Sequence, residues 1–277
     1  MRSIKKDFLS PPPGLVKFAA KHMDKMLDGD DNPIKSCKSK VRKHLETHYL
    51  KRCAYCESTI GTTGFSRVDH FRPIAKYRWL AMEWSNLLLS CEKCNEYKSD
   101  SFPLRVEKKR VINPGKESHL ADSPHMMDEG ALLLNPELDD ASEHITFSPD
   151  GSIKERNGSE KGRTTIDICK LDRDELTERY KKQIGGILYD IKDKTIIAAT
   201  FYTAIKTDED LLLIFIGTFQ ALAGLKNPGN KYVYTQLGTQ MYEEFEDFFV
   251  RKLPGNEDMR FLVRRAFELF RQRYFDS

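Results

Sequence analysis

The chain has 277 residues, of which 39% are hydrophobic and 31% are charged, with a formal net charge of +3. This length allows one large or two small domains, and the hydrophobic content suffices for a core. The net charge is too small for the protein as a whole to bind nucleic acid through its overall positive charge, so such binding would need a local basic patch or a partner. The first residues lack the apolar core of a signal peptide, and the most apolar segment, 211–225, is too short to span a bilayer. We therefore expect a soluble, cytoplasmic protein.

Two helices are predicted in the N-terminal segment, residues 1–52. They cover Leu15–Leu27 and Lys38–Lys51, and the turn-forming residues 28–33 separate them. The second helix carries a basic run that could contact phosphates or could simply form a solvated face. Its members are Lys35, Lys38, Lys40, Arg42 and Lys43.

The most informative pattern is a pair of Cys-x-x-Cys motifs, Cys53/Cys56 and Cys91/Cys94. Each pair can offer two thiolates to one tetrahedral ion, so together they predict a structural Zn²⁺ site. Unligated buried cysteines and a redox pair are the alternatives, and the lack of a secretory signal disfavours disulfides. Cys37 and Cys169 fall outside this pattern and are expected to be ordinary buried or surface thiols.

The spacer between the cysteine pairs predicts two strands. Arg67–Phe71 alternates, with Val68 and His70 on one face and Asp69 on the other, and Pro73 ends this strand. Residues 84–90 form an apolar run typical of a buried strand. A short helix is expected from Asn95, ending before Pro103. Residues 53–105 thus predict a strand–strand–helix module closed by zinc.

Beyond this module, residues 106–160 predict a connector with strands at 131–134 and 144–148, the latter turning into Ile153. Residues 161–277 predict a helical domain, with helices at 173–189, 192–205, 208–225, 235–253 and 257–274. The last helix mixes aromatic and basic residues, which suits core packing or the docking of a partner. The isolated His119, His125 and His144 are interpreted as non-catalytic. No Walker-type phosphate loop is present.

The module resembles the HNH endonucleases. The resemblance is carried by the two cysteine pairs, Asp69-His70, Trp84-x-Asn86-Leu87 and Cys94-Asn95-x-x-Lys98. It implies an α+β fold in which a zinc-stabilised ββα-metal module is joined to N-terminal helices and a mostly helical C-terminal domain. It also implies phosphodiester hydrolysis with Mg²⁺ or Mn²⁺ as the catalytic cation.

Site roles follow from this resemblance. His70 is the general base, because imidazole titrates near neutral pH, and Asp69 is a ligand of the catalytic metal. Asn86 orients the loop carrying the base. Asn95 stands where the family usually has His; its amide oxygen suits Mg²⁺, although it could instead cap the helix. Lys98 could contact the phosphate or be merely solvated.

A narrower similarity, to the PtuB nucleases, extends outside the module. These are the HNH subunits of Septu-type anti-phage systems, including systems attached to retrons. The matching segments are residues 1–6, His70–Pro73, Leu134–Asp140, Arg163–Ile166 and Leu171–Arg173. The similarity implies a PtuA-like ATPase partner, and a retron reverse transcriptase with its RNA–DNA hybrid as a further one.

Two other function classes stay open on sequence alone. A zinc-dependent nucleic-acid-binding module without catalysis would not need His70, and a scaffold subunit could keep the nuclease fold only as structure. Nothing in the sequence distinguishes DNA from RNA as the substrate, because a site of this kind handles phosphates rather than bases.

Overall fold

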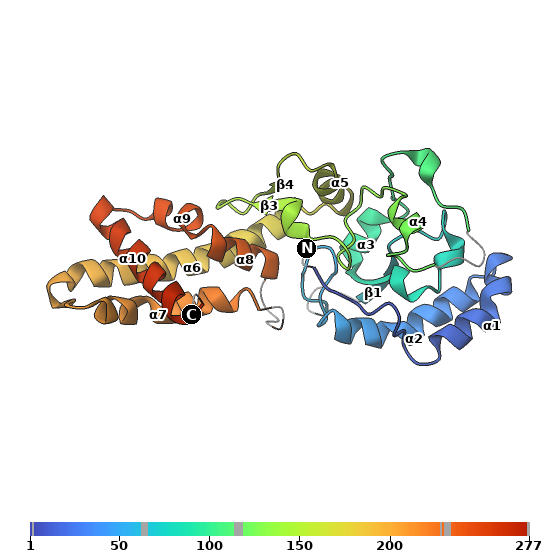
Figure 1. Ribbon diagram of the computed structural model, residues 1–277, viewed down its shortest axis with the longest axis horizontal. Helices are drawn as coiled ribbons and strands as arrows, with labels where there is room; N and C mark the ends of the chain where they lie inside the picture. Colours follow the sequence, from blue (N-terminus) through green and yellow to red (C-terminus); the bar gives the residue numbers. More distant parts are fainter. Residues whose placement is uncertain (2, 62–65, 114–118, 228, 230–233, 276–277) are drawn as a thin grey trace. The chain divides into compact units, whose positions relative to one another are not determined.

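The computed structural model describes residues 1, 3–61, 66–113, 119–227, 229 and 234–275 (Figure 1). These residues form helices and two antiparallel two-stranded sheets, so the fold is α+β. The chain divides into two compact units. The first comprises Met1–Ile145 and Lys154–Asp172, and the second comprises Thr146–Ile153 and Arg173–Ser277. No helix in the described part of the chain combines the length and apolarity needed to span a bilayer.

The first unit is built around the β1–β2 hairpin. Its elements are α1 (Leu15–Leu27), α2 (Asn32–His48), β1 (Ser66–His70), β2 (Leu87–Cys91), α3 (Glu92–Lys98), α4 (Pro124–Met127) and α5 (Glu160–Cys169). The strands are antiparallel, with His70 opposite Leu87 and Ser66 opposite Cys91. Helix α2 packs against both α1 and β1, and α3 packs against α5. Every residue of β2 is buried, as its apolar sequence predicts.

The second unit is helical. Its helices are α6 (Asp174–Thr200), α7 (Asp208–Gly224), α8 (Thr235–Glu243), α9 (Phe245–Phe248) and α10 (Glu257–Tyr274). Helix α7 packs against α6 and α10, and the ring of Phe219 lies at the centre of an aromatic core. A capping box formed by Thr207 and Asp210 starts α7, which fixes where this helix begins.

The chain passes into the second unit through β3 (Ile145–Phe147) and returns through β4 (Ile153–Glu155). Within the second unit, the side-chain amide of Gln240 in α8 pairs with the backbone of Phe147 in β3 through two hydrogen bonds, as a neighbouring strand would. Its Oε1 accepts from the Phe147 N–H at 2.8 Å, and its Nε2 donates to the Phe147 carbonyl at 2.9 Å. The hairpin is therefore fastened by a side-chain amide as well as by its own backbone.

Two segments singled out by the sequence comparison lie together in the first unit. The fully buried Lys6 donates to the carbonyls of Trp84 and Leu87 at 2.8 and 2.7 Å, and pairs with Glu137 at 3.0 Å. The Ile4 N–H donates to the Pro136 carbonyl at 2.7 Å. Through Ile4 and the buried Lys6, residues 3–6 and the Leu134–Asp140 motif together support the start of β2.

Several predicted boundaries differ from the structure. The four predicted regions are arranged as two units, and α5 belongs to the first of them rather than to the helical domain. Helix α2 starts at Asn32, before Lys38, because Pro33 occupies a first-turn position that tolerates it. Residues 131–134 form no strand and contribute only an isolated bridge between Ala131 and Leu104.

The helical domain also differs in its breaks. The two helices predicted at 173–189 and 192–205 are one helix, α6, because no proline interrupts residues 189–192. The single helix predicted at 235–253 is divided into α8, α9 and a 3₁₀ turn. The division falls at Glu244, whose φ of −100° and ψ of 39° are not helical.

Candidate active site

The four motif cysteines meet at one point. All four are buried, and their sulfur atoms lie within 4.8 Å of one another. The Sγ atoms of Cys56 and Cys91 are 3.8 Å apart, and a tetrahedral site with zinc–sulfur bonds of about 2.3 Å requires a separation of about 3.8 Å. The donor set and its geometry therefore fit Zn²⁺. This cluster joins the Cys53–Cys56 segment to the end of β2 and the start of α3.

Cys91 has a second structural task. It is the N-cap of α3, and its Sγ accepts from the Cys94 N–H at 3.5 Å. Asn95 therefore lies inside α3 and does not cap it, so the capping alternative raised by the sequence is wrong. Cys37 and Cys169 are both fully buried and lie outside the cluster.

A separate cavity of about 340 Å³ lies where β1 ends and α3 faces it. Asp69, His70 and Asn95 all line this cavity, so the structure brings together three of the five predicted catalytic residues. Strict strand alternation would place Asp69 and His70 on opposite faces. Here β1 ends at His70, and the backbone then leaves the strand, so both side chains reach the same cavity.

The carboxylate of Asp69 is held in place by two buried neighbours. The Tyr55 hydroxyl donates to its Oδ2 at 2.7 Å, and the Lys98 ammonium lies 3.3 Å from its oxygens. Lys98 also donates to the His70 carbonyl at 2.7 Å. Because one ammonium ties both residues of the Asp-His pair to α3, it fixes their position relative to Asn95.

Lys98 differs from its predicted role. Its side chain is fully buried and it does not line the cavity, so the structure places it behind Asp69 rather than where a phosphate would bind. The physical reason is its position on the inner face of α3, where the Asp69 carboxylate compensates the buried charge. Lys98 is thus a positioning residue in this geometry.

The His70 imidazole is buried and its tautomer is set by one hydrogen bond. Its Nε2 lies 2.9 Å from the Ala81 carbonyl, which can only accept, so Nε2 carries the proton and Nδ1 keeps its lone pair. Burial, with the nearby Lys38 and Lys98 charges, lowers the pKa of His70 to about 3. The ring is therefore neutral at physiological pH with Nδ1 unprotonated, but in this environment it is a weaker proton acceptor than an imidazole that titrates near neutral pH.

Asn86 does not line the cavity but fixes the loop that follows β1. Its Oδ1 accepts from the Arg72 N–H at 2.8 Å, and its Nδ2 donates to the carbonyls of Arg72 and Leu80 at 3.0 and 3.2 Å. Both ends of the loop are thus tied to one buried amide, and Ala81, which orients His70, follows directly. The loop-orienting role of Asn86 stays a prediction, and these hydrogen bonds support it.

Lys38 of α2 also lines the cavity. Burial lowers the pKa of its ammonium, which the charge of Asp69 opposes. The sequence placed Lys38 in a basic run of five residues but could not single it out, because only the packing of α2 against β1 brings this one cation to the cavity. His119, His125 and His144, predicted to be non-catalytic, do not line it.

The carboxylate of Asp69 and the side-chain amide of Asn95 line an open cavity, and both carry oxygen ligands of the kind that hard divalent cations prefer. The thiolate cluster and this oxygen-rich cavity are different sites with different metal preferences. A ββα hairpin with a four-cysteine cluster and such a cavity is the arrangement expected of an HNH-type site.

Comparison with known proteins agrees with this geometry. Residues 53–101 match the family model described as HNH endonuclease, so the chain carries an HNH endonuclease domain. The match begins at Cys53, the first cysteine of the cluster, and ends just beyond α3. It lies within the 53–105 module that the sequence predicted.

Two curated relatives extend the similarity. The chain is 39% identical over 156 residues to the Septu protein PtuB of Bacillus mycoides (strain KBAB4), which covers 51% of this chain and 50% of the relative. It is 28% identical over 123 residues to the Septu protein PtuB of Bacillus thuringiensis, covering 44% of this chain and 37% of the relative. The chain thus spans half or less of the length of these relatives.

Proposed function

We propose that this protein is a metal-dependent endonuclease that hydrolyses phosphodiester bonds of nucleic acid as the effector of an anti-phage defence complex. The observation that carries the proposal is the convergence of Asp69, His70 and Asn95 on one cavity beside the four-cysteine cluster. A nucleic-acid-binding module or a scaffold would not require a neutral imidazole with a free Nδ1 at that position.

His70 acts as the general base. Its Nδ1 takes a proton from the attacking water while Nε2–H stays bonded to the Ala81 carbonyl, which stabilises the imidazolium that forms. The water oxygen bonds to phosphorus, and the bond to the leaving 3′-oxygen breaks. Asn86 keeps the imidazole in place through the loop it holds.

Asp69 and Asn95 would hold a catalytic Mg²⁺ or Mn²⁺. When bound, such a cation stabilises the charge that develops on the phosphate and the leaving oxygen. Tyr55 and Lys98 orient the Asp69 carboxylate, which lines the same cavity as Asn95. The cysteines 53, 56, 91 and 94 would hold a structural Zn²⁺ that keeps β1 and α3 together.

Lys38 is the cation that we assign to the phosphate. It lines the cavity, whereas Lys98 is buried behind Asp69. Lys43 lies on the same helix, is exposed and does not line the cavity, so it provides a matched control. Lys38→Ala is expected to weaken binding of a nucleic-acid substrate in EDTA, and Lys43→Ala is expected to leave it unchanged.

Cleavage assays test the proposed activity. Purified protein should cleave at least one of plasmid DNA, single-stranded DNA and tRNA with Mg²⁺ or Mn²⁺, and EDTA should abolish the cleavage. Asn95→Ala should raise the metal concentration needed for half-maximal rate, and the Lys43→Ala control should not. Absence of cleavage of all three substrates, with the partner described next also present, would refute the nuclease proposal.

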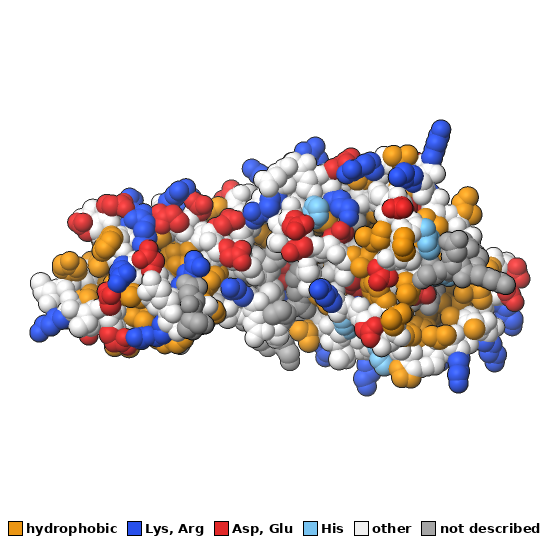
Figure 2. Space-filling model, viewed as in Figure 1, with side chains coloured by type: hydrophobic (Ala, Val, Ile, Leu, Met, Phe, Trp, Pro, Cys, Tyr) orange, Lys and Arg blue, Asp and Glu red, His pale blue; other side chains and the backbone are white. Residues whose placement is uncertain are grey.

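We propose that the partner protein is a PtuA-like ATPase, as the resemblance to the PtuB nucleases implies. Exposed apolar side chains on the second unit support a protein interface there, including Ile196 of α6, Leu213 of α7 and Phe261 of α10. Orange side chains are visible among the charged ones over these helices in Figure 2. Co-purification with an ATPase, or with a retron reverse transcriptase, tests this. Loss of capture in Leu213→Asp, but not in the exposed-site control Lys43→Ala, is expected.

A further inference from the structure

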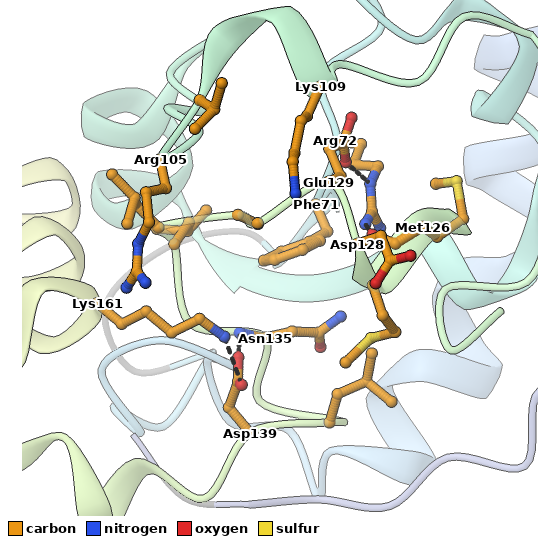
Figure 3. A pocket seen from close by; sticks show the side chains of 17 residues that line it. Phe71, Arg72, Arg105, Lys109, Met126, Asp128, Glu129, Asn135, Asp139 and Lys161 are labelled. Carbon is orange, nitrogen blue, oxygen red and sulfur yellow. Dashed lines mark hydrogen bonds and ion pairs between the residues drawn. The ribbon is translucent and has the colours of Figure 1, made fainter. Parts of the chain in front are cut away.

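A second cavity of about 340 Å³ lies in the first unit, and none of its lining residues lines the catalytic cavity (Figure 3). Its wall is contributed by the residues directly after β1, by the segment 105–109, by residues 126–133 and by the Leu134–Asp140 motif. The proposed catalysis uses none of these side chains. The motif is therefore only partly explained by its support of β2.

Asn135 presents an unused hydrogen-bond donor to this cavity. Its side chain is only 3% exposed, and its Oδ1 accepts from the Glu137 N–H at 2.9 Å, which fixes the orientation of the amide. Within the described residues, its buried Nδ2 has no hydrogen-bond partner. Figure 3 shows the amide pointing into the cavity. A buried donor without an acceptor is unfavourable, so a ligand with an acceptor atom would bind here.

The support beneath Asn135 is rigid. Its backbone N–H donates to Asp139 Oδ2 at 2.8 Å, and Lys161 donates to Asp139 Oδ1 at 2.7 Å. On another side of the cavity, Arg72 pairs with Glu129 at 2.8 Å, with both side chains buried. Lys161 and Arg72 are thus neutralised by carboxylates, and they shape the cavity rather than supply it with charge.

The other walls are apolar and the rim is basic. Phe71, Met126 and Leu133 are buried and line the cavity. Aromatic and thioether groups pack well against flat rings. At the rim, Lys109 points into the cavity (Figure 3). Arg105 makes a solvent-exposed pair with Glu160 at 3.5 Å, which screens its charge little. Asp128 is the remaining carboxylate of the lining.

We propose that this cavity binds a nucleotide. An acceptor atom on a nucleobase would take the hydrogen bond from Asn135 Nδ2, the base would lie against the apolar wall, and Lys109 and Arg105 would contact the phosphate. The nucleotide is either a residue of a nucleic-acid strand or a free nucleotide, since both offer this chemistry. The assignment does not depend on cleavage in the other cavity.

Binding of 5′-mononucleotides and of a short single-stranded oligonucleotide, measured calorimetrically in EDTA, tests the proposal without any readout of activity. Asn135→Asp keeps the acceptor for the Glu137 N–H but removes the donor, and should weaken binding at least tenfold. Lys109→Ala should weaken binding of the mononucleotide more than that of the matching nucleoside. Lys108→Ala, at an exposed neighbour outside the cavity, should have no effect.

The outcomes separate the two sources. Binding of free mononucleotides that is sensitive to Asn135→Asp and Lys109→Ala identifies a free-nucleotide site. Oligonucleotide binding with the same sensitivity, without binding of mononucleotides, identifies a strand residue. No binding of any probe, or binding that neither substitution weakens, overturns the proposal. If Asn135→Asp proves unstable, the binding measurement with Lys109→Ala, at an exposed position, decides the outcome.

Discussion

Replacing Asn86 by alanine separates a positioning role from a catalytic one. The Asn86 amide is buried and makes three hydrogen bonds, to the N–H and carbonyl of Arg72 and to the carbonyl of Leu80. Asn86→Ala leaves all three backbone groups without this partner. The loop between these groups leads to Ala81, which holds the His70 imidazole, so the substitution should impair both stability and activity.

The magnitude follows from the count of stranded groups. The Leu80 carbonyl also accepts from the Glu83 N–H at 3.1 Å, so among the described residues only the N–H and the carbonyl of Arg72 are left unsatisfied. Each such group costs about 1–3 kcal/mol, and water entering the vacated space recovers part of this, so the two groups cost about 2–4 kcal/mol. In a domain of roughly 150–250 residues, each kcal/mol lowers the melting temperature by about 2–4 °C. The expected decrease in melting temperature of Asn86→Ala is therefore roughly 4–16 °C.

Thermal unfolding followed by circular dichroism at fixed zinc concentration measures this decrease. Asn95→Ala is the matched control, because it makes the same chemical change at a half-buried helix position where alanine is well tolerated. The free energy of unfolding of Asn95→Ala should lie within about 1 kcal/mol of the wild-type value. This variant should nevertheless lose activity. A melting temperature for Asn86→Ala close to that of wild type would refute the loop-holding role.

The other predictions concern metal, charge and partner. Cys91→Ser should give unfolded or insoluble protein, because zinc binding is coupled to folding; metal analysis of the purified wild type should find one Zn²⁺ per chain. Lys98→Met should destabilise the protein by about 3–5 kcal/mol, measured by denaturant unfolding, because it leaves the buried Asp69 carboxylate uncompensated; unchanged stability would contradict the positioning role. Asp69→Ala should weaken the divalent-metal dependence as well as the rate, which a metal titration of the cleavage rate measures. A protein that stays alone beside a co-expressed ATPase would show the partner proposal to be mistaken.

The four-cysteine module could be predicted from sequence because its signals are local. The spacing of the cysteines indicates that they meet in one cluster, and the apolar run before Cys91 indicates the buried strand. The start of that strand was missed. Residues 84–86 form a 3₁₀ turn, because the Glu83 carboxylate accepts from the Ser85 N–H and caps it. Such a side-chain contact leaves no periodic signal.

The charged residues of the site show what sequence cannot supply. Lys98 and Lys38 look alike as lysines on amphipathic helices, but one is buried behind Asp69 and the other lines the catalytic cavity. Burial of Lys98 depends on the packing of α3 against β1, and the position of Lys38 depends on the packing of α2. The ion pair of Lys6 with Glu137 likewise joins segments far apart in the chain.

The most direct test of the account compares the cleavage rates of wild type and His70→Ala under conditions where wild type cleaves. The substitution removes one hydrogen bond, to the Ala81 carbonyl, so the zinc content and the fold should be retained. The loss of a general base should lower the rate by about 10²–10⁴-fold. A folded, zinc-loaded His70→Ala protein that cleaves at a rate near that of wild type would contradict the account.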